Sequence, residues 1–581
     1  MKYIKHMITI SMVFLFAYGS ENQKNSLTFE KEYSEEDIVD GGTLVVGIMG
    51  DPEALNPLTA LSKHAKDVVS LIFRSLADIN ADLNSFSPQL AKSWLFSNDG
   101  LSITFNLRTD VLWHDGERFT AKDVIFTYAM QTDPGVGWDG LFYKESIRAV
   151  KALNDSTVIF EFLERTPTML MDAVEGYIVP EHLLADITPN RIAEAEFNRS
   201  PIGTGPFKFV KWKTQQSIVL EKFNKYYIEG KPHLDRIVFQ VVSNNISLWQ
   251  QVRSGDVDLM EGVPPRDFVK LKDDWAKRKT NIRPITFLGR QYDFIGWNLI
   301  DPDHYATVMA EAGDEEVDLD RLLKPNKFFG NQKVRAALTM AIDRSAITEL
   351  VNQGMAVRMD GPTPIIWTSY NNEANTIWHY NPDLAVQFLN DEGWVDSDGD
   401  GVLDKDGLKF SFEMATNIGN ERRKQALTII QEQLSGIGVE MIQKIADPGL
   451  LFGRMLIPRQ FDAALIGWEV GLKMDLTPLF HSSSLLMPFN FTSFRSQEFD
   501  KLKEAAKGNF DRTATQEYWD NIAKLLSFEL PYTWLYYKME NVALHKRFKG
   551  TVIDKRGTYI NLEDWWVPRE ERTEVDRMAP N

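Results

Sequence analysis

Short runs in which polar and apolar residues alternate predict β-strands in the first third of the chain. Residues 102–108 and 157–162 alternate with a period of two, which is the pattern of a strand with one buried face. Residues 42–48 form a β-branched run bounded by glycines and a turn-rich segment, and this run predicts a further strand. Between the alternating runs, residues 120–128 open with a capping hydroxyl and continue at helical spacing. The pattern indicates a unit that mixes helices and strands.

The second half of the chain shows helical spacing more often. Residues 331–342, 383–390 and 421–434 are rich in helix-forming residues, with apolar positions three and four apart. A strand entry at residues 436–439 follows the last of them. The Pro/Gly cluster at residues 201–207 interrupts the pattern and predicts a crossing between domains.

The N-terminus has the layout of an export signal. Lys2 and Lys5 precede an apolar stretch, residues 7–18, and small residues follow it. This stretch is shorter than the roughly 20 residues that a membrane-crossing helix needs. We therefore expect a signal peptide at residues 1–19, a flexible tether at 20–40, and a protein that is exported and is periplasmic or associated with the cell envelope. Ser20 stands where a bacterial lipoprotein carries its lipid-bearing cysteine.

Composition excludes several classes of function. The chain has 581 residues, more than one hydrophobic core usually supports, so we expect two or three domains. Its net charge is −18 and it has no long basic run, which argues against nucleic acid as a partner. It has no cysteine, and its 9 histidines are scattered without a zinc-protease or hydrolase motif. No residue is predicted to be catalytic.

One acidic segment resembles a calcium loop. Its oxygen-bearing candidates are Asp396, Asp398, Asp400 and Asp404. Gly407 stands at the twelfth place, where a calcium loop carries a bidentate glutamate. The alternative is an acidic surface turn that caps a hairpin. A structural calcium ion is therefore one expectation for this loop, and no other cofactor is expected.

Several motifs occur together in a characteristic order. They are residues 88–94, 99–108, 113–124, 203–207, 254–258, 334–337, 341–344 and 531–536. In this order and spacing they resemble family 5 of the bacterial extracellular solute-binding proteins, which contains oligopeptide-, dipeptide- and nickel-binding proteins. The resemblance runs through nearly the whole mature chain.

The resemblance implies an α/β fold of the two-lobed periplasmic-binding-protein type (type II, cluster C), with an additional α+β domain and a hinge. The implied parts are lobe I at residues 41–60 and 201–286, the additional domain at 61–200, lobe II at 287–535, and a return to lobe I with a C-terminal tail at 536–581.

The resemblance also implies a set of solute-binding residues near the cleft between the lobes. From the first lobe to the second, they are Glu53, Asn56, Tyr292, Trp297, Asn298, Trp468 and Glu469. Trp468 and Glu469 are also singled out by their place after an apolar run, because loops at strand ends carry many binding groups. Core packing of Trp468 is the alternative. Peptide-binding members carry an aspartate where this chain has Gly471, and Glu469 or Asp475 could replace it.

On these grounds we expect a non-catalytic binding protein that delivers peptides to the membrane permease of an ABC importer and acts as a monomer. Hinge closure would bury the solute between the lobes. The alternatives left open are an oligosaccharide or another solute as cargo, or a cleft enzyme such as a glycosidase.

Overall fold

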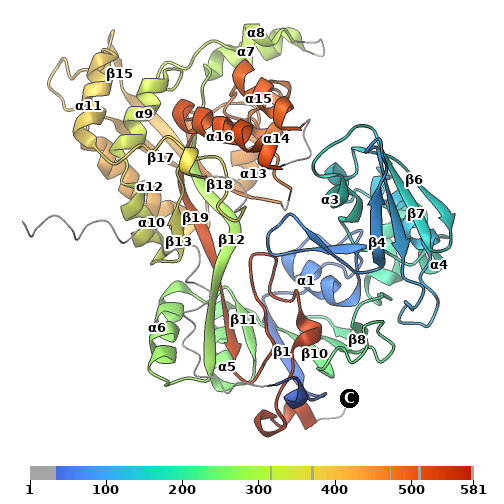
Figure 1. Cartoon of the computed structure of the whole chain (residues 1–581). Coiled ribbons are helices and arrows are strands. Elements are labelled where there is room, and N and C mark those ends of the chain that lie inside the picture. Colours follow the sequence, from blue (N-terminus) through green and yellow to red (C-terminus); the bar gives the residue numbers. More distant parts are fainter. Residues whose placement is uncertain (1–33, 314–316, 368–371, 472, 508–511, 578–581) are drawn as a thin grey trace, which may run out of the picture.

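The protein is organised around one large sheet that passes through two lobes. The computed structural model describes residues 34–313, 317–367, 372–471, 473–507 and 512–577. The sheet has the strand order β17-β16-β18-β12-β19-β11-β1-β10-β9-β8, and β13 also pairs with β19. Figure 1 shows lobe II above, lobe I below and the additional domain to one side. The predicted signal peptide and most of the predicted tether lie outside the described residues.

Lobe I is the half of the sheet that contains β1, with helices packed on it. Its elements are β1 (Thr43–Ile48), β8 (Phe207–Lys213), β9 (Ser217–Lys222), β10 (Arg236–Val241), β11 (Leu259–Glu261), α1 (Lys63–Ile72), α5 (Asn245–Ser254) and α6 (Pro265–Ala276). All six residues of β1 are buried, since it lies between β10 and β11 and is parallel to both.

The additional domain contains a separate four-stranded antiparallel sheet of order β4-β5-β7-β6. Its elements are β2 (Ala77–Ile79), β3 (Phe86–Pro88), β4 (Ala91–Phe96), β5 (Ser102–Leu107), β6 (Ile147–Asn154), β7 (Thr157–Phe162), α2 (Ala121–Thr132), α3 (Met169–Val174) and α4 (Glu181–Leu184). The strands predicted at 102–108 and 157–162 are confirmed as β5 and β7. The predicted helix at 120–128 is α2, capped by Thr120 and Asp123.

Lobe II holds the other half of the sheet and most of the helices. Its strands are β13 (Ala356–Arg358), β14 (Asp404–Lys405), β15 (Leu408–Lys409), β16 (Ser411–Asn417), β17 (Glu440–Ala446) and β18 (Ala463–Glu469). Its helices are α7 (Pro302–Ala312), α8 (Leu319–Leu322), α9 (Gln332–Ala341), α10 (Arg344–Asn352), α11 (Pro382–Asp391), α12 (Glu421–Ser435), α13 (Pro448–Leu450), α14 (Thr477–Phe480), α15 (Gln497–Lys507) and α16 (Arg512–Glu529). The three helices predicted in this half are confirmed as α9, α11 and α12.

Two long strands connect the lobes. They are β12 (Ile282–Trp297) and β19 (Tyr532–His545), which pair antiparallel along most of their lengths and run side by side in Figure 1. Their pairing is irregular between Leu288 and Tyr292. The sequence-based borders at 286/287 and 535/536 therefore fall inside continuous strands rather than in loops.

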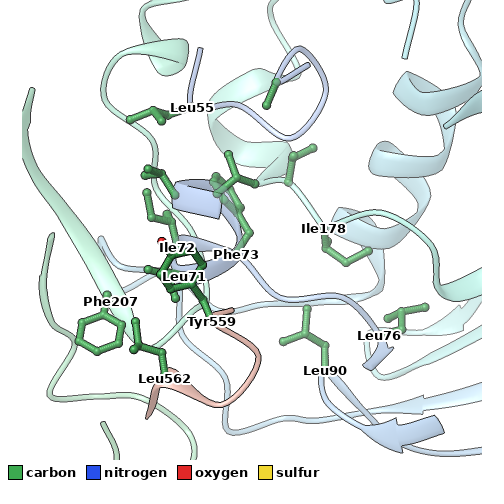
Figure 2. Packing of buried hydrophobic residues seen from close by; sticks show 14 of the residues in the cluster. Leu55, Leu71, Ile72, Phe73, Leu76, Leu90, Ile178, Phe207, Tyr559 and Leu562 are labelled. Atoms are coloured by element: carbon green, nitrogen blue, oxygen red, sulfur yellow. The ribbon is translucent and has the colours of Figure 1, made fainter. Parts of the chain in front are cut away.

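Lobe I and the additional domain share one hydrophobic core, whereas lobe II has its own. The shared cluster joins β1 residues such as Val46 to residues of β5 and β7 such as Phe105 and Phe160. Figure 2 shows part of it, with Phe73, Leu90 and Ile178 around the end of α1. A common core makes these two parts one body, so relative motion is expected between that body and lobe II.

The predicted crossing at 201–207 is a close contact with α1. A Cβ atom at Gly203 would lie 1.9 Å from the carbonyl oxygen of Ile72, so no larger residue fits there. The Gly205 N–H donates to that oxygen at 2.7 Å. The His114 ring bonds both glycines, and burial lowers its pKa to about 4, so it is neutral at physiological pH. This contact fixes the position of α1, which carries residues of the candidate site.

Candidate functional site between the lobes

The parallel strands of both lobes point their carboxyl ends at the boundary between the lobes. In lobe I, β11 is antiparallel to β19, so it runs toward lobe II and ends at Glu261. In lobe II, β18 is antiparallel to β12, so it runs toward lobe I and ends at Glu469. Ligands of open α/β sheets bind outside the carboxyl ends of the strands. We call the region where these ends face each other the inter-lobe interface.

On the lobe I side, two carboxylates share one ammonium group. Lys63 donates to Asp67 at 2.8 Å and also contacts Glu261. Thr558 donates a second hydrogen bond to Glu261. Burial, together with the nearby Glu261 carboxylate, raises the pKa of Asp67 to about 7, although Lys63 and Arg290 act in the opposite direction.

On the hinge, the irregular part of β12 places Arg290 at the same interface. Its guanidinium group lies 3.4 Å from Glu469 and acts electrostatically on Asp67 across the interface. Two buried tyrosines, Tyr292 and Tyr537, are paired in register and stack beside it with their ring centroids 6.4 Å apart. We call the β12–β19 pair the hinge edge.

Opposite the hinge edge, side chains of the additional domain bind lobe II. Asp172 of α3 forms an ion pair with Lys473 at 2.9 Å, and the Asp172 side chain is 0% exposed. Burial raises the pKa of Asp172, while Lys473 opposes this shift. A second pair joins Glu164 to Lys507 at 2.6 Å, with both side chains more exposed.

Apolar and backbone contacts complete this side. Leu83, in the turn between β2 and β3, is fully buried in the lobe II cluster that contains Ile366 and Tyr537. Lys555, near the C-terminus, donates to the carbonyl oxygen of Ile366 at 2.7 Å. We call the contacts of Asp172, Glu164, Leu83 and Lys555 with lobe II the closing edge.

Two of the predicted lobe I residues stabilise the chain between β1 and α1. Glu53 accepts hydrogen bonds from the backbone N–H groups of Leu61 and Ser62. Asn56 is 0% exposed, bonds Asn198 and accepts from the N–H of Leu58. Because its amide is enclosed by these contacts, the structure corrects the prediction of a solute contact at Asn56.

Trp297 and Asn298 lie in the core of lobe II, which corrects their prediction as solute-binding residues. The Trp297 indole is 0% exposed and donates to Thr533 at 3.0 Å. The Asn298 amide donates to the carbonyl oxygens of Arg459 and Phe461. The physical reason is strand direction: β12 runs away from the interface, so its carboxyl end lies deep in lobe II.

The remaining predicted residues lie closer to the interface. Tyr292 is buried within the hinge edge, where its ring stacks on that of Tyr537. Trp468 is half-buried against Phe294 and Phe489, and its indole N–H donates to Tyr532 at 3.3 Å. Glu469 is exposed beside Arg290.

Asp475 is engaged within lobe II. It forms an ion pair with Lys503 at 3.0 Å and accepts a hydrogen bond from the backbone N–H of Thr477. A Cβ atom at Gly471 would lie 3.4 Å from the Tyr143 hydroxyl, so the additional domain closely covers that position.

The acidic loop brings some of its predicted ligands together. Asp396, Asp398 and Asp404 can place oxygen atoms within 4.8 Å of one another. Asp400 is outside this group, and Lys409 lies 2.7 Å from both Asp398 and Asp400. Calcium binding at this loop stays a prediction.

Several residues of the interface were not found from the sequence. They are Lys63, Asp67, Tyr143, Asp172, Glu261, Arg290 and Tyr537. Glu261 carried a usable signal, because it ends a short apolar run as Glu469 does. The others depend on which elements meet in space.

The fold and the interface define the class of protein as a binding protein with two lobes. The chain belongs to the bacterial extracellular solute-binding proteins, family 5, whose model (family 5 Middle) matches residues 85–483. This family consists of solute-binding proteins rather than enzymes. Within the described ranges, no helix combines the length and apolarity needed to span a membrane.

Known proteins resemble the chain along almost its whole length. The oligopeptide-binding protein AppA of Bacillus subtilis (strain 168) is 31% identical over 568 residues, which is 97% of this chain and 98% of that protein. The solved structure of AppA in complex with a nonapeptide has a TM-score of 0.70 and covers 91% of this chain and 99% of that one. NikZ of Campylobacter jejuni in complex with Ni(L-His) is 26% identical, with a TM-score of 0.69, and covers 90% of this chain and 99% of NikZ.

Proposed function

We propose that this protein captures peptides between its lobes and delivers them, chemically unchanged, to the membrane permease of an ABC importer. It acts outside the cytoplasmic membrane and as a monomer. The observation that carries the proposal is the correspondence, over 91% of the chain, with a relative solved around a nonapeptide.

The geometry supports this function in two ways. The carboxyl ends of parallel strands from both lobes meet at the inter-lobe interface, so a solute there contacts both lobes at once. The closing edge joins the lobes through side chains that can separate. A solute that contacts both lobes favours the closed state by its differential affinity for that state.

The test is a thermal-denaturation panel on the full mature chain. Its arms are mixed oligopeptides, oligosaccharides and nickel–histidine, each over a range of concentrations. A true cargo raises the melting temperature progressively as its concentration increases. At a concentration one hundred times Kd, the ligand adds about 2.7 kcal/mol to the free energy of unfolding. We expect this response from peptides.

Chromatography of the bound peptide after release completes the test. Recovery of intact peptide supports a binding protein, and recovery of fragments would indicate an enzyme. If oligosaccharide or nickel–histidine raises the melting temperature and no peptide does, the cargo is that solute rather than a peptide.

A further inference from the structure

The lobe I side of the interface carries more negative than positive charge at one point. Asp67 and Glu261 come from different elements, α1 and β11, and both contact the ammonium group of Lys63. One positive charge cannot neutralise two carboxylates, so the two repel each other. Burial opposes the charged form of Lys63, but Asp67 and Glu261 raise its pKa above the usual value, so this lysine stays charged.

Two neighbouring polar groups are free at the same place. Tyr559 is 7% exposed, and none of the described residues forms a hydrogen bond with its hydroxyl. Its ring packs edge-on against Phe239 at 6.0 Å and lies in the same cluster as the last turn of α1 (Figure 2). Burial raises the pKa of Tyr559, and the carboxylates of Glu261 and Asp67 raise it further, so both carboxylates lie within electrostatic reach of this side chain.

The second free group is on α1 itself. Nδ1 of His64 is buried and has no hydrogen-bond partner among the described residues. Burial and the nearby Lys63 lower the pKa of His64, which favours the neutral form of its ring. Buried polar groups are normally paired, and an unpaired one calls for an explanation. Nδ1 of His64 is such a group, and it lies on the same helix as Lys63 and Asp67.

We propose that Asp67, Glu261 and Tyr559 form a subsite for a cationic nitrogen of the bound peptide, either its amino-terminal ammonium or a lysine or arginine side chain. This inference rests on the proposed function and adds the charge of the preferred cargo. A ligand cation at this point neutralises the second carboxylate and gives the Tyr559 oxygen a donor. An anionic group is repelled there.

The charged groups around Asp67 come from every side of the subsite. Lys63 and His64 lie on its own helix and Glu261 on β11. Arg290 acts from the hinge edge, and Tyr559 and Tyr177 act from the C-terminal segment and the additional domain. Arg290 already pairs with Glu469 on the lobe II side, so Lys63 is the cation that contacts the two carboxylates directly.

The experiment compares four peptides by calorimetry at pH 8. They are Ala-Ala-Lys-Ala-Ala and its norleucine analogue, each with a free and with an acetylated amino terminus. The wild type is expected to bind peptides with a cation at least about 10-fold more tightly than the acetylated norleucine peptide. If acetylation lowers the affinity, the terminal ammonium is the group that binds the subsite. If replacing lysine by norleucine lowers the affinity, the lysine side chain is that group.

Three variants and one control locate the effect. Glu261→Gln and Asp67→Asn keep the shape and remove a charge, so each is expected to lose most of the preference for cationic peptides. Tyr559→Phe keeps the buried ring, and this variant is expected to lose part of the preference for cationic peptides. Asp273→Asn removes the same charge from the surface of α6, where Asp273 pairs with Lys277, and is expected to change nothing.

The outcomes separate this inference from the proposed function. Equal affinities of all four peptides for the wild type, or an undiminished preference in Glu261→Gln, overturn the subsite and leave peptide capture intact. If neither these peptides nor the mixed oligopeptides raise the melting temperature, the proposed function itself fails. Should a charge variant not fold, the wild-type preference and Tyr559→Phe still decide.

Discussion

The hinge edge and the closing edge join the same two bodies by different physical means. At the hinge edge the chain itself crosses twice, in β12 and β19, and backbone hydrogen bonds hold the crossing strands together. At the closing edge the contacts are side chains: two ion pairs, one leucine and one lysine-to-carbonyl bond. Backbone pairing survives a small rotation, whereas these side-chain contacts break when the lobes separate. The lobes are therefore connected permanently at the hinge edge and close reversibly at the closing edge.

The largest effect is expected from Lys473→Met. This change leaves the fully buried Asp172 carboxylate without its cation in the closed state, which costs about 3 kcal/mol. Since a peptide binds the closed state, its affinity is expected to fall about 100-fold. Calorimetry measures the affinity, and solution scattering measures whether peptide still reduces the radius of gyration.

The matched control for this change is the double variant Lys473→Met/Asp172→Asn. Removing both charges takes away the uncompensated carboxylate, so much of the affinity is expected to return. A single variant that binds peptide as well as the wild type would show that the closing edge contributes nothing to closure.

The next largest effect is expected from Leu83→Ala. Leu83 belongs to the other body but is buried in the lobe II core, so truncation leaves a cavity in the closed state that costs about 2 kcal/mol. The affinity for peptide is expected to fall by more than about 10-fold. Leu95→Ala is the control, because Leu95 is 67% exposed on β4. If Leu83→Ala lowers the melting temperature of the unliganded protein but leaves the affinity for peptide unchanged, Leu83 does not contribute to closure.

Between the two edges, pH is expected to act through Asp67. Its pKa is raised to about 7, so the protonated form is favoured in the folded protein, and the stability that this gives is lost as pH rises through 7. A ligand cation prefers the ionised form. The affinity for a lysine peptide is therefore expected to rise by about 10-fold between pH 6 and pH 8 and then to level off. Calorimetry across this range checks the rise, and Asp67→Asn is expected to abolish it.

His64 and the peptide itself need separate controls in that experiment. Burial and the nearby Lys63 lower the pKa of His64, so its ring gains charge only toward the acidic end of this range, whereas Asp67 loses its proton as pH rises. The acetylated norleucine peptide carries no cation and is expected to show no rise. An equal rise for both peptides would assign the pH effect to closure rather than to the subsite.

Local patterns predicted the elements well but not the faces that meet. The alternation at residues 102–108 reflects burial of one face of β5, and that burial is decided within the additional domain. The prediction of two lobes came from the family resemblance rather than from local patterns. No local signal marked β12 and β19 as strands that cross between lobes, because a crossing strand has no turn residue at the border.

The candidate site shows the same limit. Trp297 and Glu469 both stand at strand ends, and the sequence does not distinguish them. The structure does, since β12 and β18 run in opposite directions and only one of these two ends faces lobe I. Asp67 and Glu261 are 194 residues apart by their numbers and meet through Lys63, a contact that only the folded chain creates.

The smallest effect is expected from Lys507→Met, and it sharpens the comparison within the closing edge. The Lys507 and Glu164 side chains are 40% and 55% exposed, so water screens this pair in both states. Exposed ion pairs contribute about 0–1 kcal/mol, which predicts a change in peptide affinity below about 5-fold. Calorimetry at low and at high salt measures it, and added salt is expected to remove the difference from the wild type. A loss as large as that of Lys473→Met would mean that charge rather than burial governs the closing edge, because the two pairs differ chiefly in their exposure.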